Sequence, residues 1–186
     1  MVSVVVPFRA EGKTRLPEKI RADLARAMLA DVVAAALALG RVLVVGDEAD
    51  AVPVGAEAVV DPGGGQGGAV AAGLALVDGQ ALVVNADLPC ATAAALHALA
   101  AAGPALVAAA DGTTNALSLP DPSCFEPLYG PASAARFAAA GLVPVLIPEL
   151  ELDVDTLADL DGLALSLGRR TDVALQKHRV VPARTR

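Results

Sequence analysis

Short apolar runs alternate with segments of helical periodicity along most of the chain. The runs that indicate strands are residues 2–7, 41–46, 56–60, 81–85, 105–109, 116–119, 143–147 and 151–154. Several are Val-rich and apolar on both faces, which is typical of parallel strands. Helical segments are expected between them, at about 18–39, 67–77 and 131–140, after Thr92 as an N-cap, and after Asp155. This alternation predicts an α/β domain with a three-layer α/β/α architecture and a mainly parallel sheet.

Composition adds limits to this picture. We expect residues 1–186 to form a single domain, because no repeat or low-complexity linker interrupts the pattern. The net charge is −7 and aromatic residues make up only 2%, which argues against nucleic-acid binding. The tail from about 169 to 186 has six Lys/Arg and one Asp. We expect it to be a solvated end, or else a contact to a ligand or a neighbouring subunit.

The cysteines and the apolar segments indicate a cytoplasmic protein without a membrane span. Cys90 and Cys124 lack metal-ligand spacing and fit reduced thiols, and Cys90 is expected to be buried. The apolar N-terminal run is too short for a signal peptide. Gly103 and Pro104 interrupt the alanine-rich stretch 91–110, which is therefore expected to contain a turn.

Three carboxylates follow apolar runs that are expected to be strands: Asp87, Asp153 and Asp155. They are therefore expected at the carboxyl edge of the sheet, where open α/β sheets bind ligands. Neighbouring carboxylates repel one another unless a cation neutralises them. Mg²⁺ favours sites of one or two carboxylates completed by substrate phosphates, so Mg²⁺ is the expected cofactor and these three residues its expected ligands.

Two loops carry groups suited to phosphate. Arg9, Lys13 and Arg15 follow the first strand, where their charges suit a triphosphate, although a solvated loop is the alternative. A second loop precedes the helix expected at 67–77, and its backbone amides suit a base edge or a phosphate. A flexible turn explains the same composition. The residues concerned in this second loop are Gly65, Gln66, Gly67 and Gly68.

A third feature combines residues 112–117 with residues 129–133. Its hydroxyls and backbone amides suit an anionic acceptor. Capping of the helix expected from Pro131 is an alternative role for Ser133.

Five motifs, in this order, resemble the phospholactate or phosphoenolpyruvate guanylyltransferase family of deazaflavin coenzyme F-420 biosynthesis. They are residues 13–16 (KTRL), 86–89 (ADLP), 114–117 (TNAL), 130–133 (GPAS) and 153–156 (DVDT). The resemblance spans nearly the whole chain. It implies a nucleotide-diphospho-sugar-transferase-like (MobA-like) nucleotidyltransferase fold.

The resemblance also implies residue roles. Asp87, Asp153 and Asp155 would hold Mg²⁺, with Asp87 and Lys13 as catalytic residues. Lys13 and Arg15 would contact the GTP phosphates, and the loop from Gly65 to Gly68 would lie near the guanine. A three-carbon phosphate acceptor would be bound by Thr114, Gly130 and Ser133. The chain departs from the family pattern at Phe137, where a histidine is expected, at Leu157, where a proline is usual, and by one residue fewer before Thr114.

The reaction that these roles imply is transfer of GMP from GTP to phosphoenolpyruvate, giving enolpyruvyl-diphospho-guanosine and pyrophosphate. The acceptors 2-phospho-L-lactate and 3-phosphoglycerate are alternatives. So are a nucleotidyltransferase for a molybdopterin or a sugar phosphate, a non-catalytic nucleotide-binding protein of the same fold and a structural scaffold. A homodimer and transfer of a labile product to the next pathway enzyme are further expectations about partners.

Overall fold

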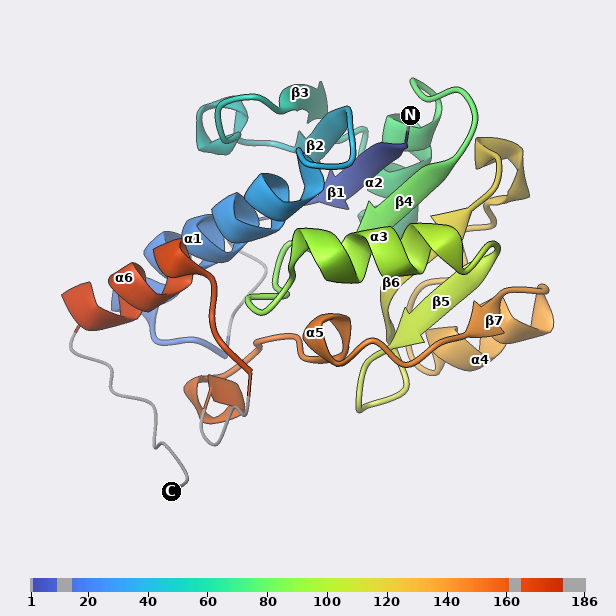
Figure 1. The fold of residues 1–186 in the computed structure, drawn as a ribbon. Coiled ribbons are helices and arrows are strands. Elements are labelled where there is room, and N and C mark those ends of the chain that lie inside the picture. Colours follow the sequence, from blue (N-terminus) through green and yellow to red (C-terminus); the bar gives the residue numbers. More distant parts are fainter. Residues whose placement is uncertain (1, 10–14, 161–164, 179–186) are drawn as a thin grey trace.

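The computed structural model describes residues 2–9, 15–160 and 165–178. Its centre is a seven-stranded sheet with the strand order β3-β2-β1-β4-β6-β5-β7 (Figure 1). The strands are β1 (Ser3–Pro7), β2 (Val42–Gly46), β3 (Glu57–Val60), β4 (Ala81–Val84), β5 (Ala105–Ala108), β6 (Thr114–Leu119) and β7 (Val143–Pro144). Strands β1 to β4 are parallel, and only β6 runs antiparallel to its two neighbours. The expected mainly parallel sheet is confirmed.

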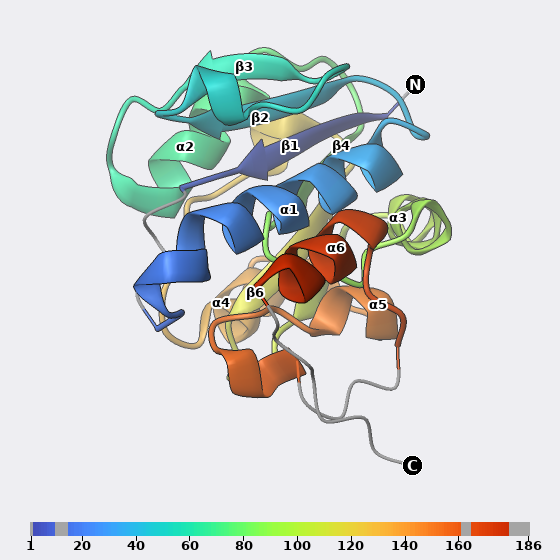
Figure 2. The ribbon, with the colours of Figure 1, turned by 90° about the vertical axis from the view of Figure 1, so that its left-hand side faces the viewer.

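Helices cover both faces of the sheet. The helices α1 (Glu18–Ala36), α3 (Ala93–Ala101) and α5 (Pro148–Glu151) pack on one face, in a core built around alternate valines of β1 and β2. The helices α2 (Gly65–Leu74) and α4 (Ser133–Ala139) pack on the other face, against the intervening strand residues (Figures 1 and 2). The valines of the strands face both layers, which explains why these runs are apolar throughout.

A third, smaller cluster joins the C-terminal part of the chain to α1. The helix α6 (Arg169–Lys177) lies along α1, and Leu175 is buried with Leu24 and Met28 (Figure 2). Residues 169–177 are therefore not a solvated end, and the expectation for the first half of the basic tail was wrong. The buried carboxylate of Asp31 on α1 accepts hydrogen bonds from the first N–H groups of α6, which holds this helix in place.

Several predicted element boundaries were wrong. Residues 151–154 do not form a strand: α5 ends at Glu151, and Leu152 continues as extended backbone without a sheet partner. Pro148 favours this helical turn because proline suits the first turn of a helix. The helix expected from Pro131 begins at Ser133, because Ala132 precedes it with a left-handed φ of 56°. Strand β7 is short, and Pro144 lacks the N–H that a longer ladder requires.

One further prediction for local structure, the cap of α3, was confirmed. Thr92 caps α3 through a hydrogen bond from Ala95 N at 3.1 Å.

Short 3₁₀ turns complete the connections at Ala49–Ala51, Pro122–Cys124 and Leu157–Leu160. Among the described helices, none has both the length and the apolar character that crossing a membrane requires.

Candidate active site at the carboxyl edge of the sheet

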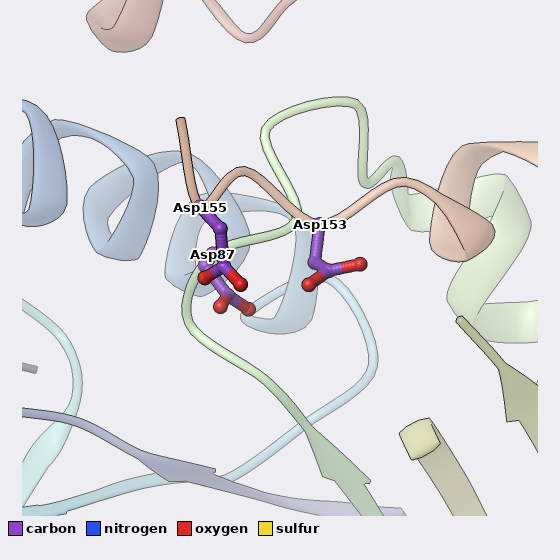
Figure 3. A group of neighbouring side chains, drawn as sticks. All are labelled: Asp87, Asp153 and Asp155. Carbon is purple, nitrogen blue, oxygen red and sulfur yellow. The ribbon is translucent and has the colours of Figure 1, made fainter. Parts of the chain in front are cut away.

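Three aspartates from two distant parts of the chain meet beyond the end of β4. One carboxylate oxygen each from Asp87, Asp153 and Asp155 lies within 4.8 Å of the others (Figure 3). All three residues are partly buried. The predicted convergence is confirmed, although Asp153 and Asp155 reach the site from an irregular segment rather than from a strand.

Asp87 is placed by the continuation of β4. Asn85 N donates to Asn115 O at 3.0 Å, so the pairing of β4 with β6 extends one residue past the strand. Leu88, directly after Asp87, is fully buried against α1 and α3. A sheet contact on one side and a buried leucine on the other fix the backbone that carries the Asp87 carboxylate.

Asp153 and Asp155 are placed by the residue between them. Val154 N donates to Asp87 O at 3.1 Å, and the Val154 side chain is fully buried in the cluster between α1 and α6. In extended backbone, residues i and i+2 point to the same side, so burial of Val154 leaves its two neighbours on the side of Asp87. Asp159 Oδ2 then accepts from Asp155 N at 2.9 Å and Thr156 N at 2.6 Å, which fixes the turn that follows.

The two described arginines at this edge, Arg9 and Arg15, lie beside carboxylates. Arg9 donates to Asp61 Oδ2 from Nε at 3.1 Å and from Nη2 at 2.7 Å. The hydrogen bond from Arg9 lowers the pKa of Asp61, assisted by the N–H of Gly63 and opposed by burial. Arg15 Nη1 lies 3.6 Å from Asp155 Oδ2. Lys13, the remaining predicted phosphate contact, lies outside the described residues.

A pocket of about 300 Å³ opens beside Asp87. Met28 and Ala69 line its apolar part, and its polar wall is formed by Arg9, Asp61, Gln66 and Asn85. Gln66 Nε2 donates to Asn85 Oδ1 at 2.7 Å, so the glycine loop is tied to the segment that leads to Asp87. The pocket therefore extends from the predicted nucleotide loop to the aspartate cluster.

The glycine loop also contacts the predicted acceptor region. Helix α2 starts within the loop, at Gly65. A Cβ atom at Gly67 would lie 2.8 Å from Pro127 Cβ, which is closer than side chains approach one another. Glycine at this position lets the first turn of α2 touch the segment that leads to Gly130. The two predicted substrate regions are thus neighbours.

The structure brings the three predicted acceptor residues together. Thr114 Oγ1 and Ser133 Oγ are 3.0 Å apart, and both residues are buried. Gly130 O accepts from Ser133 N at 3.0 Å, while Gly130 itself is exposed. Ser133 is not a helix cap, because its hydroxyl pairs with Thr114 across the layers. Binding of an acceptor by these residues stays a prediction.

Two of the departures from the family pattern are apolar packing positions. Phe137 is 2% exposed, and the centroid of its ring lies 5.2 Å from that of Tyr129 in an edge-on arrangement. The ring centroid of Phe125, the third member of this aromatic group, lies 6.5 Å from that of Phe137. Leu157 packs against the cluster between α1 and α6. The position where a histidine was expected therefore belongs to the core that supports the acceptor loop.

Some residues that build the site were not predicted from the sequence. Asp61, Asn85, Asn115 and Asp159 all bond to segments that carry predicted site residues. Asp61 and Asn85 follow apolar strands at the same edge as Asp87, which is a signal that sequence reasoning can use. Asn115 is a polar residue within a buried strand, which is a second signal. Asp159 gives no comparable signal.

Comparisons with known proteins agree with this fold. Residues 18–146 match the MobA-like NTP transferase domain family. This match contains Asp87 but ends before Asp153 and Asp155. A putative nucleotide-diphospho-sugar transferase from Desulfovibrio desulfuricans G20 has a similar fold, with a TM-score of 0.65 and 19% identity over 96% of this chain and 95% of that chain. A nucleotidyl transferase from Methanothermobacter thermautotrophicus has a TM-score of 0.61 and 17% identity, with 95% of this chain and 99% of that chain covered.

Curated relatives match over almost the full length. The phosphoenolpyruvate guanylyltransferase of Geodermatophilus obscurus is 38% identical over 93% of both chains. The enzyme of the same name from Thermomonospora curvata is 39% identical over 91% of this chain and 86% of its own. Phosphoenolpyruvate guanylyltransferase 2 of Rhodococcus jostii is 32% identical over 91% and 87%, respectively. The chain therefore belongs to the phosphoenolpyruvate guanylyltransferase family, within the MobA-like NTP transferases.

Proposed function

We propose that this protein is a Mg²⁺-dependent guanylyltransferase that transfers GMP from GTP to phosphoenolpyruvate. The products are enolpyruvyl-diphospho-guanosine and pyrophosphate, and the resemblance assigns this step to coenzyme F-420 biosynthesis. The observation that carries the proposal is a group of three aspartates whose carboxylate oxygens lie within 4.8 Å of one another. This group lies beside a pocket, in a member of this family.

The aspartate cluster fits Mg²⁺. Its donors are hard carboxylate oxygens from Asp87, Asp153 and Asp155, and Asp87 also lines the pocket. Mg²⁺ is usually held by one or two carboxylates together with substrate phosphates. When bound, the ion would neutralise charge on the phosphates of the nucleotide.

The pocket and its charged wall suit the nucleoside and its phosphates. Arg9, Lys13 and Arg15 supply positive charge after β1, and the glycine loop with Gln66 borders the other end of the pocket. The Arg9–Asp61 pair is supported by the N–H of Gly63, so the guanidinium is held in one orientation before a ligand arrives. Arginine held in this way can present its remaining N–H groups to a phosphate.

The transfer itself needs little acid–base chemistry from the protein. An acceptor phosphate oxygen forms a bond to the α-phosphorus of GTP, while the bond from that phosphorus to the bridging oxygen breaks and pyrophosphate leaves. The second pKa of a phosphate monoester is about 6, so the acceptor is already mostly dianionic at neutral pH. The task of the protein is to orient the reactants and to neutralise charge.

Thr114, Gly130 and Ser133 are the proposed acceptor contacts. In the hydrogen bond between the Thr114 and Ser133 hydroxyls one hydroxyl only accepts, so its own O–H stays available to donate to an acceptor oxygen. The neighbouring Gly130 is exposed, which supports approach of the acceptor from that side. The alternative acceptors 2-phospho-L-lactate and 3-phosphoglycerate carry the same phosphate and carboxylate groups, so the polar contacts do not separate them.

The proposal is tested by incubating the protein with each nucleoside triphosphate against each of the three acceptors. Pyrophosphate release and product mass are measured. We expect release with GTP and phosphoenolpyruvate, and a product of the mass of enolpyruvyl-diphospho-guanosine. A faster reaction with another acceptor would identify that acceptor as the substrate in place of phosphoenolpyruvate. Binding of GTP without pyrophosphate release in any combination would favour a non-catalytic nucleotide-binding protein. A homodimer and transfer of the product to the next enzyme remain predictions.

A further inference from the structure

We propose that Asn115 is a positioning residue that holds the segment carrying Asp153 and Asp155 against the sheet, so that their carboxylates meet Asp87. This inference rests on the proposed function, because it concerns how the metal-binding carboxylates are assembled. Asn115 does not line the pocket described above, so its effect on the nucleotide is indirect.

The Asn115 side chain is bonded to the helical turn that precedes the two aspartates. Asn115 is the second residue of β6 and is 2% exposed. Its Nδ2 donates to Leu150 O at 3.1 Å and to Glu151 O at 3.0 Å. These carbonyls lie at the C-terminal end of α5, where a helix leaves its carbonyl groups without intrahelical partners. Asn115 supplies the missing donors.

The Asn115 backbone is bonded to the segment that carries the third aspartate. Asn115 O accepts from Asn85 N at 3.0 Å, two residues before Asp87. A single residue thus joins the end of β4 to the end of α5. The second link is the bond from Val154 N to Asp87 O at 3.1 Å. The links at Glu151 and Val154 lie on either side of Asp153, so its position depends on both.

The chemistry of this position favours asparagine. The position requires two N–H donors in a buried, uncharged side chain, and an amide provides both from one nitrogen. A carboxylate here would face two carbonyl oxygens and repel them. An alanine would leave both carbonyls without these donors. Without the link, the segment would depend more on its other described contacts, which include the Val154 bond, the packing of Val154 and the approach of Arg15 to Asp155.

The test uses Asn115→Ala, with Ser118→Ala as the matched control on the same strand. Ser118 is fully buried, and among the described residues its hydroxyl has no hydrogen-bond partner, so its removal perturbs the same strand without breaking a link. Hydrogen–deuterium exchange reports the link without reference to activity. We expect faster exchange of residues 150–156 in Asn115→Ala, with β1 unchanged, and wild-type exchange in Ser118→Ala.

The second readout is the Mg²⁺ concentration at half-maximal pyrophosphate release from GTP and phosphoenolpyruvate. Since loss of residues that orient metal ligands typically costs 10–100-fold, we expect about a 10-fold higher Mg²⁺ requirement, with the KM for GTP at saturating Mg²⁺ within about threefold of the wild type. Recovery of turnover at high Mg²⁺ would distinguish positioning from loss of the fold. A wild-type Mg²⁺ requirement, or unchanged exchange at 150–156, would overturn the inference.

Two outcomes remain to be separated. If Asn115→Ala does not fold, Asn115→Ser keeps one donor and takes its place, with an intermediate Mg²⁺ requirement expected and a wild-type requirement contradicting the inference. If the wild type releases no pyrophosphate with any substrate pair, the proposed function fails, while the exchange measurement still decides whether Asn115 holds the segment.

Discussion

The backbone N–H of Val154 donates a hydrogen bond to the carbonyl oxygen of Asp87 at 3.1 Å. This bond joins the segment after α5 to the segment after β4, although Asp87 and Val154 are 67 positions apart in the sequence (154 − 87). The buried Val154 side chain turns its two aspartate neighbours toward the same side as Asp87. The expected outcomes below follow from this arrangement and from the contacts around it.

Asp87 is the aspartate that both belongs to the cluster and lines the pocket. Loss of a residue that only supports a metal ligand typically costs 10–100-fold in metal affinity or activity. Asp87→Asn removes the charge of a ligand itself, so we predict that it lowers turnover by more than about 100-fold. Circular dichroism and thermal unfolding should stay close to the wild type. The matched control is Asp78→Asn, an exposed position before β4, at the opposite edge of the sheet. Near-normal turnover of Asp87→Asn with Mg²⁺ would rule out the metal role.

The Arg9–Asp61 pair predicts a pH dependence of stability. The hydrogen bond from Arg9 lowers the pKa of Asp61 in the folded protein. A lowered folded pKa stabilises the fold fully above the ordinary carboxyl pKa of about 3.9, and this contribution is lost as the pH falls through the folded pKa. Asp61→Asn should therefore be less stable than the wild type at pH 7, and the difference should shrink below about pH 4.

Urea unfolding of both proteins between pH 3 and pH 7 measures this difference. Glu57→Gln is the control for an exposed pair: a hydrogen bond from Arg41 also lowers the pKa of Glu57, but the Glu57 side chain is 54% exposed, so we expect a smaller change of stability with pH. A difference between wild type and Asp61→Asn that does not change with pH would show that the charge of Asp61 contributes nothing to the fold.

Asp31 supplies the N-terminal cap of α6 from a different helix. Its carboxylate accepts from Arg170 N at 3.1 Å and from Thr171 N at 2.8 Å. A Cβ atom at residue 168 would overlap this carboxyl group, so Gly168 allows the close approach. Loss of a helix cap typically costs 0.5–2 kcal/mol, and we expect Asp31→Ala to lower the free energy of unfolding by about 1–2 kcal/mol.

The comparison variant for Asp31 is Asp23→Ala on the same helix. Asp23 pairs with Lys177 at 2.6 Å on the surface, and exposed ion pairs contribute less than about 1 kcal/mol. Denaturant titration should therefore rank Asp31→Ala as the more damaging change. The reverse order would mean that α6 is held mainly by its surface charges.

The two cysteines should differ in reactivity. Burial raises the pKa of the Cys90 thiol to about 11, and the carboxylate of Glu149 adds to the effect. Cys124 is exposed. Because the thiolate is the reactive form, iodoacetamide at pH 8 should label Cys124 in the native protein and both cysteines in urea. Mass spectrometry of the labelled peptides measures the extent of labelling at each cysteine. Labelling of Cys90 in the native protein at the rate of Cys124 would contradict the burial of Cys90.

The sequence predicts those parts of the site that follow parallel strands. Arg9 follows β1 and Asp87 follows β4, and parallel strands end at the same edge. The alternation of Glu151, Leu152, Asp153 and Val154 predicts an extended backbone, but whether such a segment pairs with a strand depends on tertiary contacts. Here Glu151 is the last residue of α5, and residues 152–154 continue without joining the sheet.

The remaining contacts depend on pairs of residues that the sequence does not relate. Asn115 donates to carbonyls 35 and 36 residues away, and Asp31 accepts from amides 139 and 140 residues away. Each is visible in the sequence only as a polar residue in a buried strand or on the apolar face of a helix. The partner, and therefore the role, becomes identifiable only when the fold brings the two segments together.

The most direct test of the central claim is the dependence of pyrophosphate release on free Mg²⁺, measured with the wild-type protein, GTP and phosphoenolpyruvate. The three-aspartate site predicts no release in excess EDTA and restoration of release as Mg²⁺ is added back. Release that continues at an undiminished rate in EDTA would contradict it.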